Sequence, residues 1–185
     1  IVNEMVGGGF FKWRPGQFTD DTDQTLAIVD SLIENGRYIP QDIAQRFLQW
    51  YQNDPVDIGG TTRLSLSQLE TGVNYKDSGK LALDMGKGPA NGSLMRTHPL
   101  GLYFRRDFDK LDRSAEEISS ITHAHRECVL ACQMASRLTA LLADGFSKDD
   151  SLELLYQRFR TDSIAEDKLN RATRGEVYPG KIGYV

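Results

Sequence analysis

Helical periodicity runs through almost the whole chain and limits the possible fold more than any other feature. Between residues 16 and 36, apolar residues recur at the three- and four-residue spacing of a single helix face: Leu26, Val29, Leu32 and Ile33. Residues 124–145 carry the strongest pattern of this kind. No stretch shows the sustained two-residue alternation of a half-buried strand. The sequence therefore predicts an all-α fold.

Local signals divide this pattern into several helices. We expect helices over residues 40–53, 61–72, 78–86, 113–123, 124–145 and 147–160. Ser114 with Glu117, and Ser147 with Asp150, have the spacing of a capping box, which marks a helix start. The tail from Gly175 has no helical pattern and is predicted to be a loop.

Length and charge exclude several classes of function. The chain has 185 residues and a net charge of −4, which fits one soluble domain over residues 1–185. The sequence contains no basic stripe long enough to neutralise several phosphates, so we expect no nucleic-acid partner. Its apolar runs are far shorter than the roughly 20 residues of a membrane span, and the N-terminus does not resemble a signal peptide. We therefore expect no membrane partner and a cytoplasmic location.

Motifs of several common chemistries are absent from the sequence. There is no Gly-x-Ser-x-Gly, no P-loop and no dinucleotide-binding glycine pattern, which argues against serine hydrolases, nucleotide triphosphatases and dinucleotide oxidoreductases. Cys128 and Cys132 lie one helical turn apart, but no second cluster of Cys and His completes a metal site. We interpret them as two small buried residues.

The segment Thr19-Asp20-Asp21-Thr22-Asp23 crowds three acids and two hydroxyls into five positions. One interpretation is that Asp20 or Asp21 is the cap of the helix that follows, because acidic residues suit a helix N-terminus. That interpretation explains one carboxylate well and does not need the others. A divalent cation such as Mg²⁺ or Mn²⁺ would remove the repulsion, since hard ions bind carboxylates, hydroxyls and water. Spacing alone leaves both interpretations open.

A second candidate is Asn91-Gly92-Ser93, which lies in a stretch of small residues before a predicted helix. Backbone N–H groups in such a turn can approach a phosphate, and Arg96 could add positive charge. The alternative is a plain turn with Ser93 as a helix cap and Arg96 on the solvated surface. Pro99 and Gly101 should kink or break the helix that begins at Ser93.

A third candidate is the pair His123 and His125, at the start of the predicted helix over 124–145. Two positions apart, the side chains point in different directions on a helix, which argues against one shared metal ion. One of them could contact a ligand. A structural hydrogen-bonding role is the default for either histidine taken alone.

Taken in order, three segments resemble the ADP-ribosylglycohydrolase family: "GGGFFKWRPGQFTDDTDQTLAI", "ANGSLMRTHPLG" and "THAHRECVLAC". The resemblance spans residues 7–145. It implies an orthogonal helical bundle with a binuclear Mg²⁺ or Mn²⁺ centre at the bottom of an ADP-ribose cleft. It also implies a hydrolase that cleaves the glycosidic bond between ADP-ribose and a modified protein side chain or small acceptor.

The resemblance assigns roles to individual residues of the acidic motif. By position, Thr19, Asp20 and Asp21 match the family's metal ligands, and the two carboxylates are the expected catalytic residues. A cation pair held there would bind ribose hydroxyls and stabilise charge as the glycosidic bond breaks. Gly8 and Gly9 fall in the family's glycine-rich turn before this motif, so they are expected to contact substrate.

The other two segments match the family's ligand cleft. The residues expected to contact ADP-ribose by this resemblance are Asn91, Gly92, Ser93, Met95, Arg96 and His123. In the family, the Asn-Gly-Ser step contacts the phosphates and the distal ribose. The expected partner is therefore ADP-ribose, free or attached to a protein side chain.

Two departures from the family pattern leave an alternative open. Family members carry a Gly-Asp-Thr-Asp-Thr-like motif near the C-terminus that completes the metal site, and this sequence has none. Only Glu4 precedes the Thr-Asp-Asp motif as a possible further acid. We therefore expect the middle part of a family member, incomplete at both ends of its domain. The alternative is a relative that binds ADP-ribose, or has a structural role, without catalysis.

Overall fold

The computed structural model describes residues 4–175, and within this range it contains nine α-helices, one short 3₁₀-helix and no strand. The predicted all-α fold is confirmed. The elements are α1 (Asp20–Asn35), α2 (Pro40–Gln52), α3 (Gly60–Glu70), α4 (Tyr75–Asp84), η1 (Leu94–Arg96), α5 (His98–Tyr103), α6 (Phe108–Ser120), α7 (Arg126–Ala143), α8 (Lys148–Phe159) and α9 (Ser163–Thr173). The loop predicted from Gly175 lies, after its first residue, outside the described residues.

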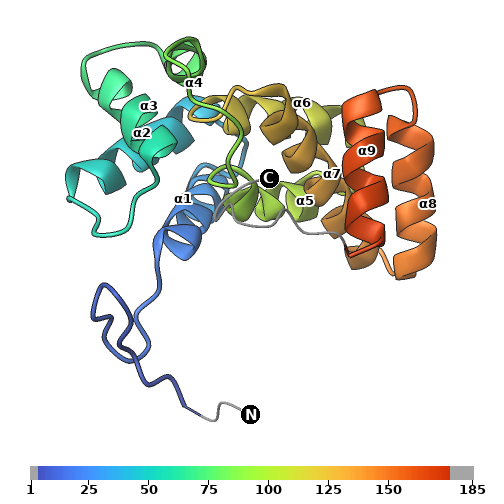
Figure 1. Cartoon of the computed structure of the whole chain (residues 1–185), viewed down its shortest axis with the longest axis horizontal. Helices are drawn as coiled ribbons and strands as arrows, with labels where there is room; N and C mark the ends of the chain where they lie inside the picture. The colour runs from blue at the N-terminus through green and yellow to red at the C-terminus, as the bar shows by residue number, and fades with distance from the viewer. Residues whose placement is uncertain (1–3, 176–185) are drawn as a thin grey trace.

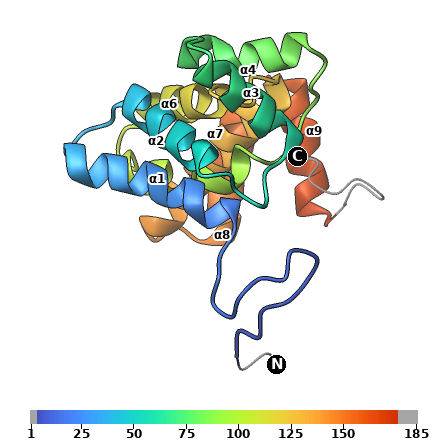
Figure 2. The same ribbon diagram turned by 90° about the vertical axis from the view of Figure 1, so that its left-hand side faces the viewer.

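Helix α7 lies at the centre of the molecule and contacts α5, α6, α8 and α9. Helices α1 to α4 form one end of the body, and α8 and α9 lie side by side at the other end (Figure 1). Residues 4–19 extend away from the helices in both views (Figures 1 and 2). No helix among residues 4–175 is both long enough and apolar enough to cross a bilayer.

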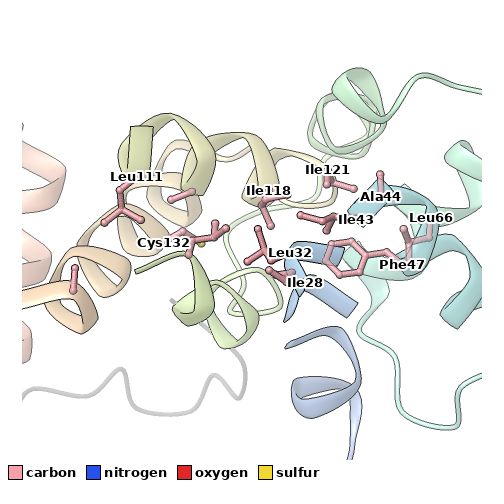
Figure 3. Close-up of a cluster of buried hydrophobic side chains, with 13 residues drawn as sticks. Ile28, Leu32, Ile43, Ala44, Phe47, Leu66, Leu111, Ile118, Ile121 and Cys132 are labelled. Carbon is pink, nitrogen blue, oxygen red and sulfur yellow. The ribbon is translucent and has the colours of Figure 1, made fainter. Parts of the chain in front are cut away.

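The largest buried cluster joins α1, α2, α3, α5, α6 and α7 (Figure 3). Ile28, Ile43, Phe47 and Ile118 are all fully inaccessible to solvent. Burying each of these large side chains contributes about 1.5–3 kcal/mol relative to exposure. Because this cluster brings the N-terminal helices onto α6 and α7, it also fixes the relative positions of the motifs singled out in the sequence.

The inward face of α1 differs from the one that the apolar pattern predicts. Leu26 and Ile33 are 41% and 73% exposed, whereas the polar side chain of Gln24 is fully buried beside Ile28 and Leu32. Gln24 can lie inside because its side-chain oxygen accepts a hydrogen bond from Arg96. Hydrophobic spacing cannot anticipate this rotation of the helix, because the contact that selects it comes from a distant segment.

Of the two predicted capping boxes, the one at Ser147 marks a helix start and the one at Ser114 does not. Ser147 caps α8 and accepts a hydrogen bond from the Asp150 backbone N–H, as predicted. The capping box at Ser114 is wrong, because Ser114 lies buried in the middle of α6 and Asp107 caps that helix instead. Helix α9 was not predicted at all.

The break predicted near Pro99 is present, but it precedes the proline. The 3₁₀ turn η1 ends at Arg96, and α5 then begins with Pro99 in its first turn, where the missing N–H costs nothing. The break predicted at Gly101 is wrong, because Gly101 lies inside α5 and packs against α7. A Cβ there would lie 2.3 Å from the Ser136 carbonyl oxygen. Glycine therefore serves close helix packing at this position.

A buried carboxylate ties α6 to α7 and α8. Asp112 is 7% exposed and accepts two hydrogen bonds from the Arg137 guanidinium, at 2.6 and 2.8 Å. Arg158 adds a third at 3.0 Å. The Arg137 guanidinium also lies 4.6 Å from the ring centre of Phe108. The charges of this network are compensated only while all its members are present.

We expect Asp112→Ala to lower the free energy of unfolding by about 3–5 kcal/mol, because it leaves the buried Arg137 without its counter-charge. Urea denaturation followed by circular dichroism measures the change. The matched control is Asp109→Ala, an exposed position on the same helix, which should change stability by about 0.5 kcal/mol or less. Equal losses in both variants would contradict a stabilising role for the network.

Candidate functional site

Two cavities share Asp20 in their walls and bring the three sequence motifs together. The acidic cavity, of about 280 Å³, is lined by Trp13, Gln17, Phe18, Thr19, Asp20, Asp23, Trp50 and residues 53–57. The glycine cavity, of about 240 Å³, is lined by Asp20, Gly59, Gly60, Thr61, Thr62, Ala90, Asn91, Gly92, Met95 and His123. The first helix of the chain therefore presents one carboxylate to both spaces.

Asp20 is the first residue of α1 and the most perturbed acid at the site. Burial, and then the negative charges of Asp57 and Asp21, raise the pKa of its carboxyl to about 6. One of its oxygens accepts a hydrogen bond from the Asp21 backbone N–H at 3.1 Å. The positive end of the helix dipole and this bond favour ionisation, yet burial and neighbouring negative charge prevail.

The other members of the acidic motif have distinct positions. Thr19 occupies the N-cap position of α1, and its hydroxyl donates to the Asp21 carboxylate at 3.2 Å. Neither Asp20 nor Asp21 is the cap, which corrects the simple capping interpretation. Asp21 is exposed and lines neither cavity. Asp23 accepts a hydrogen bond from the Trp50 indole N–H at 3.1 Å, which gives this acid a structural partner.

Asp57 is a candidate residue that the sequence analysis missed. It lies in the loop between α2 and α3, lines the acidic cavity with Asp20, and raises the pKa of that carboxyl. The available signal was the stretch Asp54-Pro55-Val56-Asp57, in which two acids flank a proline turn just before a helix. Nothing in that stretch alone indicates that it approaches Asp20.

The donors at this site suit a hard cation, although they form an incomplete set. Thr19, Asp20 and Asp57 offer hydroxyl and carboxylate oxygens, the ligands that Mg²⁺ and Mn²⁺ prefer. Burial, followed by the negative charges of Asp57 and Asp21, raises the pKa of Asp20, and a bound cation would oppose this effect. Among residues 4–175, however, no three His, Cys, Asp or Glu side chains converge as a metal-binding group.

The glycine cavity needs a residue without a side chain at Gly92. A Cβ at this position would lie 2.8 Å from the His123 ring and 3.1 Å from the Thr62 hydroxyl oxygen. The N-terminus of α3, at Gly60, lines the same cavity and has no side-chain cap. The first N–H groups of a helix have no partner within it, so they are available to an anion.

His123 is 3% exposed, and its Nδ1 lies 2.7 Å from the Thr122 hydroxyl oxygen. Burial, and then the positive charge of Arg96, lower the pKa of its ring to about 3, so the ring is neutral at physiological pH. His125 is used differently: it is the N-cap of α7, and its Nδ1 accepts a hydrogen bond from the Glu127 N–H at 3.2 Å.

Two residues expected in the cleft lie in the core beside it. Arg96 is fully buried, and its guanidinium lies 4.2 Å from the ring centre of Phe47. Ser93 is also fully buried, where its hydroxyl oxygen accepts a hydrogen bond from Ser119 at 2.9 Å. Neither lines the glycine cavity. Their connection to a ligand would run through the residues that they hold in place.

Gly8 and Gly9 are not brought to either cavity. Both lie in the segment that extends away from the helices, where Gly8 pairs with Trp13 through two backbone hydrogen bonds of 2.8 Å. Their positive φ angles of 101° and 73° fit a turn that favours glycine. The glycine-rich turn is therefore present, and Trp13 on its far side is the residue that reaches the acidic cavity.

Comparison with known sequences finds a family model and relatives that match most of this chain. The family model described as ADP-ribosylglycohydrolase matches residues 2–184. An ADP-ribosyl-[dinitrogen reductase] glycohydrolase of Rhodospirillum rubrum is 32% identical over 146 residues, covering 78% of this chain and 48% of that protein. The ADP-ribosylarginine hydrolase Tri1 of Serratia proteamaculans is 28% identical over 156 residues, covering 80% and 41%.

A solved structure described as an ADP-ribosylglycohydrolase-related protein complex superimposes with a TM-score of 0.76 at 32% sequence identity. The match covers 99% of this chain and 60% of that chain. The expected type of helical bundle is therefore confirmed. The chain spans less than half the length of the two curated relatives described above.

We expect His123 to make stability fall as the solution is acidified. Its folded pKa of about 3 is below the ordinary 6.5, so the unfolded chain binds a proton that the folded chain excludes. The resulting loss in the free energy of unfolding is absent above pH 6.5 and grows below that pH, to about 2 kcal/mol at pH 5. Urea denaturation between pH 7.5 and 5 measures this loss.

The His123→Gln variant isolates this effect, because Asp20 acts in the opposite direction. The raised pKa of Asp20 favours the folded state as pH falls through about 6. Subtracting the variant's pH profile from that of the parent chain leaves the contribution of His123. Parallel profiles would show that the ring is protonated as easily in the folded chain as in the unfolded one.

Proposed function

The chain belongs to the ADP-ribosylglycohydrolase family, and from that premise we propose that it hydrolyses the glycosidic bond between ADP-ribose and a modified side chain. The observation that carries this proposal is the position of Asp20, between the acidic cavity and the glycine cavity. One side of Asp20 offers acids that suit a cation, and the other offers uncapped backbone N–H groups that suit a phosphate.

In this proposal, Thr19 and Asp20 at the start of α1, together with Asp57, would hold Mg²⁺ or Mn²⁺ in the acidic cavity, and Asp21 would add negative charge beside them. A divalent cation supplies positive charge that binds ribose hydroxyls and stabilises developing negative charge. The start of α3 and the turn at Asn91-Gly92 bind the diphosphate through backbone N–H groups. Together these contacts place the distal ribose beside the carboxylate of Asp20, where its bond to the side chain is cleaved.

An ADP-ribosylated arginine is the first substrate to test. The relative from Serratia proteamaculans is named an ADP-ribosylarginine hydrolase, and the one from Rhodospirillum rubrum acts on ADP-ribosyl-dinitrogen reductase. An ADP-ribosylated serine is the second candidate to test. The acidic cavity, with Trp13 and Trp50 in its walls, would take the modified side chain.

A second candidate function is binding of ADP-ribose without hydrolysis. The observation that favours it is the incomplete ligand set, since residues 4–175 bring no three metal-binding side chains together. Two ligating carboxylates alone seldom hold two cations. The glycine cavity does not depend on such an ion for its shape, so it could still bind the diphosphate.

We expect the chain to release ADP-ribose from an ADP-ribosylated arginine peptide in the presence of Mg²⁺ or Mn²⁺. The double variant Asp20→Asn, Asp21→Asn should lose at least roughly 100-fold in rate, because it removes charge that the transition state requires. Release is measured by chromatography of the reaction mixture. A serine-linked peptide is assayed in parallel.

Asp30→Asn is the matched control, because Asp30 is an exposed acid of the same helix, and it should keep the full rate. Excess chelator should abolish release, and added Mn²⁺ should restore it. Release that resists chelation would contradict the cation-binding part of the proposal. Tight binding of ADP-ribose with no release from either peptide would establish the second candidate function instead.

A further inference from the structure

We propose that Arg96 is a positioning residue that fixes His123 as the tautomer protonated at Nε2, so that a hydrogen-bond donor faces the glycine cavity. The identity of the ligand as ADP-ribose rests on the proposed function. The tautomer depends on a series of hydrogen bonds that joins three buried side chains, Arg96, Thr122 and His123. The direction of each hydrogen bond in the series follows from the one before it.

The first link is the guanidinium of Arg96, which can only donate hydrogen bonds. It donates to the Gln24 side-chain oxygen, to the Ile118 carbonyl oxygen at 3.2 Å and to the Thr122 hydroxyl oxygen at 2.7 Å. Burial lowers the pKa of Arg96 to about 10, which leaves it charged at neutral pH. Its bond to Thr122 therefore has a fixed direction.

The second link is the Thr122 hydroxyl, which carries a single proton. Its oxygen has two partners among residues 4–175, Arg96 Nη2 and His123 Nδ1. The oxygen already accepts from Arg96, so the hydroxyl proton has only the 2.7 Å contact to Nδ1 available. If Nδ1 were protonated instead, the hydroxyl proton would be buried without an acceptor, at a cost of about 1–3 kcal/mol.

The third link is the imidazole of His123. When Nδ1 accepts the hydroxyl proton, the single proton of the neutral ring is on Nε2. That nitrogen lies 3.1 Å from the position of a Cβ on Gly92, and His123 lines the glycine cavity with Asp20. Within residues 4–175 no hydrogen bond involves Nε2, which leaves its proton for an oxygen of the ligand.

The consequence is a defined chemical role for the histidine. A neutral ring protonated at Nε2 is a donor toward the cavity, so it suits a phosphate or hydroxyl oxygen of ADP-ribose. It is not a base at that nitrogen. A fixed donor loses little entropy on binding, because its orientation is set before the ligand arrives. Arg96 thus contributes to recognition without touching the ligand.

Long-range ¹H–¹⁵N correlation of the ¹⁵N-labelled chain reports the tautomer directly. The chain has three histidines, and loss of one spin system in His123→Asn identifies the ring of interest. For the parent chain we expect a protonated Nε2 and a hydrogen-bonded, unprotonated Nδ1. A protonated Nδ1 would overturn the proposal.

Two substitutions at Arg96 test the origin of the tautomer. Arg96→Lys keeps a group that can only donate, so Nε2 should stay protonated. Arg96→Gln adds an amide oxygen that can accept the Thr122 hydroxyl proton, which frees the hydroxyl to accept from Nδ1. We expect a measurable population protonated at Nδ1 in this variant alone. Identical spectra in folded Lys and Gln variants would overturn the role of Arg96.

Two substitutions at Thr122 test the hydrogen bond to His123 Nδ1 even if the Arg96 variants fail to fold. Thr122→Ser keeps the hydroxyl and should keep the parent spectrum. Thr122→Val is similar in volume but removes the hydroxyl, so the Nδ1 resonance should move to the position of an imidazole nitrogen without a hydrogen bond. An unchanged Nδ1 resonance in Thr122→Val would overturn the proposal.

Titration with ADP-ribose separates this inference from the proposed function. We expect ADP-ribose to shift the Nε2 resonance of the parent chain, and to bind more weakly to Thr122→Val than to Thr122→Ser. The tautomer is read without ligand, so a chain with no hydrolytic activity can still confirm it. The expected tautomer with no shift on adding ADP-ribose would overturn only the role toward the ligand.

Discussion

The buried guanidinium of Arg96 is the interaction on which the rest of the site depends. A charge that is fully removed from water needs hydrogen-bond acceptors, because an uncompensated one would cost several kcal/mol. Both Nη atoms of Arg96 have acceptors, whereas its Nε has no partner among residues 4–175. Here the acceptors are neutral: a Gln24 oxygen, the Ile118 carbonyl oxygen and the Thr122 hydroxyl oxygen. They come from α1, from α6 and from the segment between α6 and α7. One cation therefore holds three parts of the chain in register.

This constraint accounts for the polar residues inside the core. Gln24 faces inward although the apolar residues Leu26 and Ile33 of the same helix are exposed. A helix with a purely apolar inner face would leave Arg96 without one of its acceptors. Because Asp20 lies four residues before Gln24, the rotation that serves Arg96 also turns Asp20 toward the glycine cavity. The core contact and the orientation of the site carboxylate are thus two results of one helix rotation.

The sequence predicts the parts of this structure that are local. Amphipathic spacing predicts most of the helices, although it misses α9, and the cap at Ser147 is found because its partner is three residues away. The cap at Ser114 fails because the same short spacing recurs inside a buried helix. Asp57 is missed since its proximity to Asp20 depends on how α2 packs on α1. Arg96 is assigned to the cleft by resemblance, and only the fold shows that Arg96 lies in the core behind the cleft.

The segment that carries His123 shows how a buried loop can be rigid. Irregular segments are rarely buried, because their backbone carbonyl groups lack partners. Here the carbonyl oxygens of Ile121 and Thr122 accept hydrogen bonds from the Ser78 and Ser65 hydroxyls, at 2.7 and 2.8 Å. These serines belong to α4 and α3, so the N-terminal helices supply the hydrogen-bond donors that the loop itself lacks. The position of the His123 ring is therefore a property of the assembled bundle, and no short motif around it could specify that position by itself.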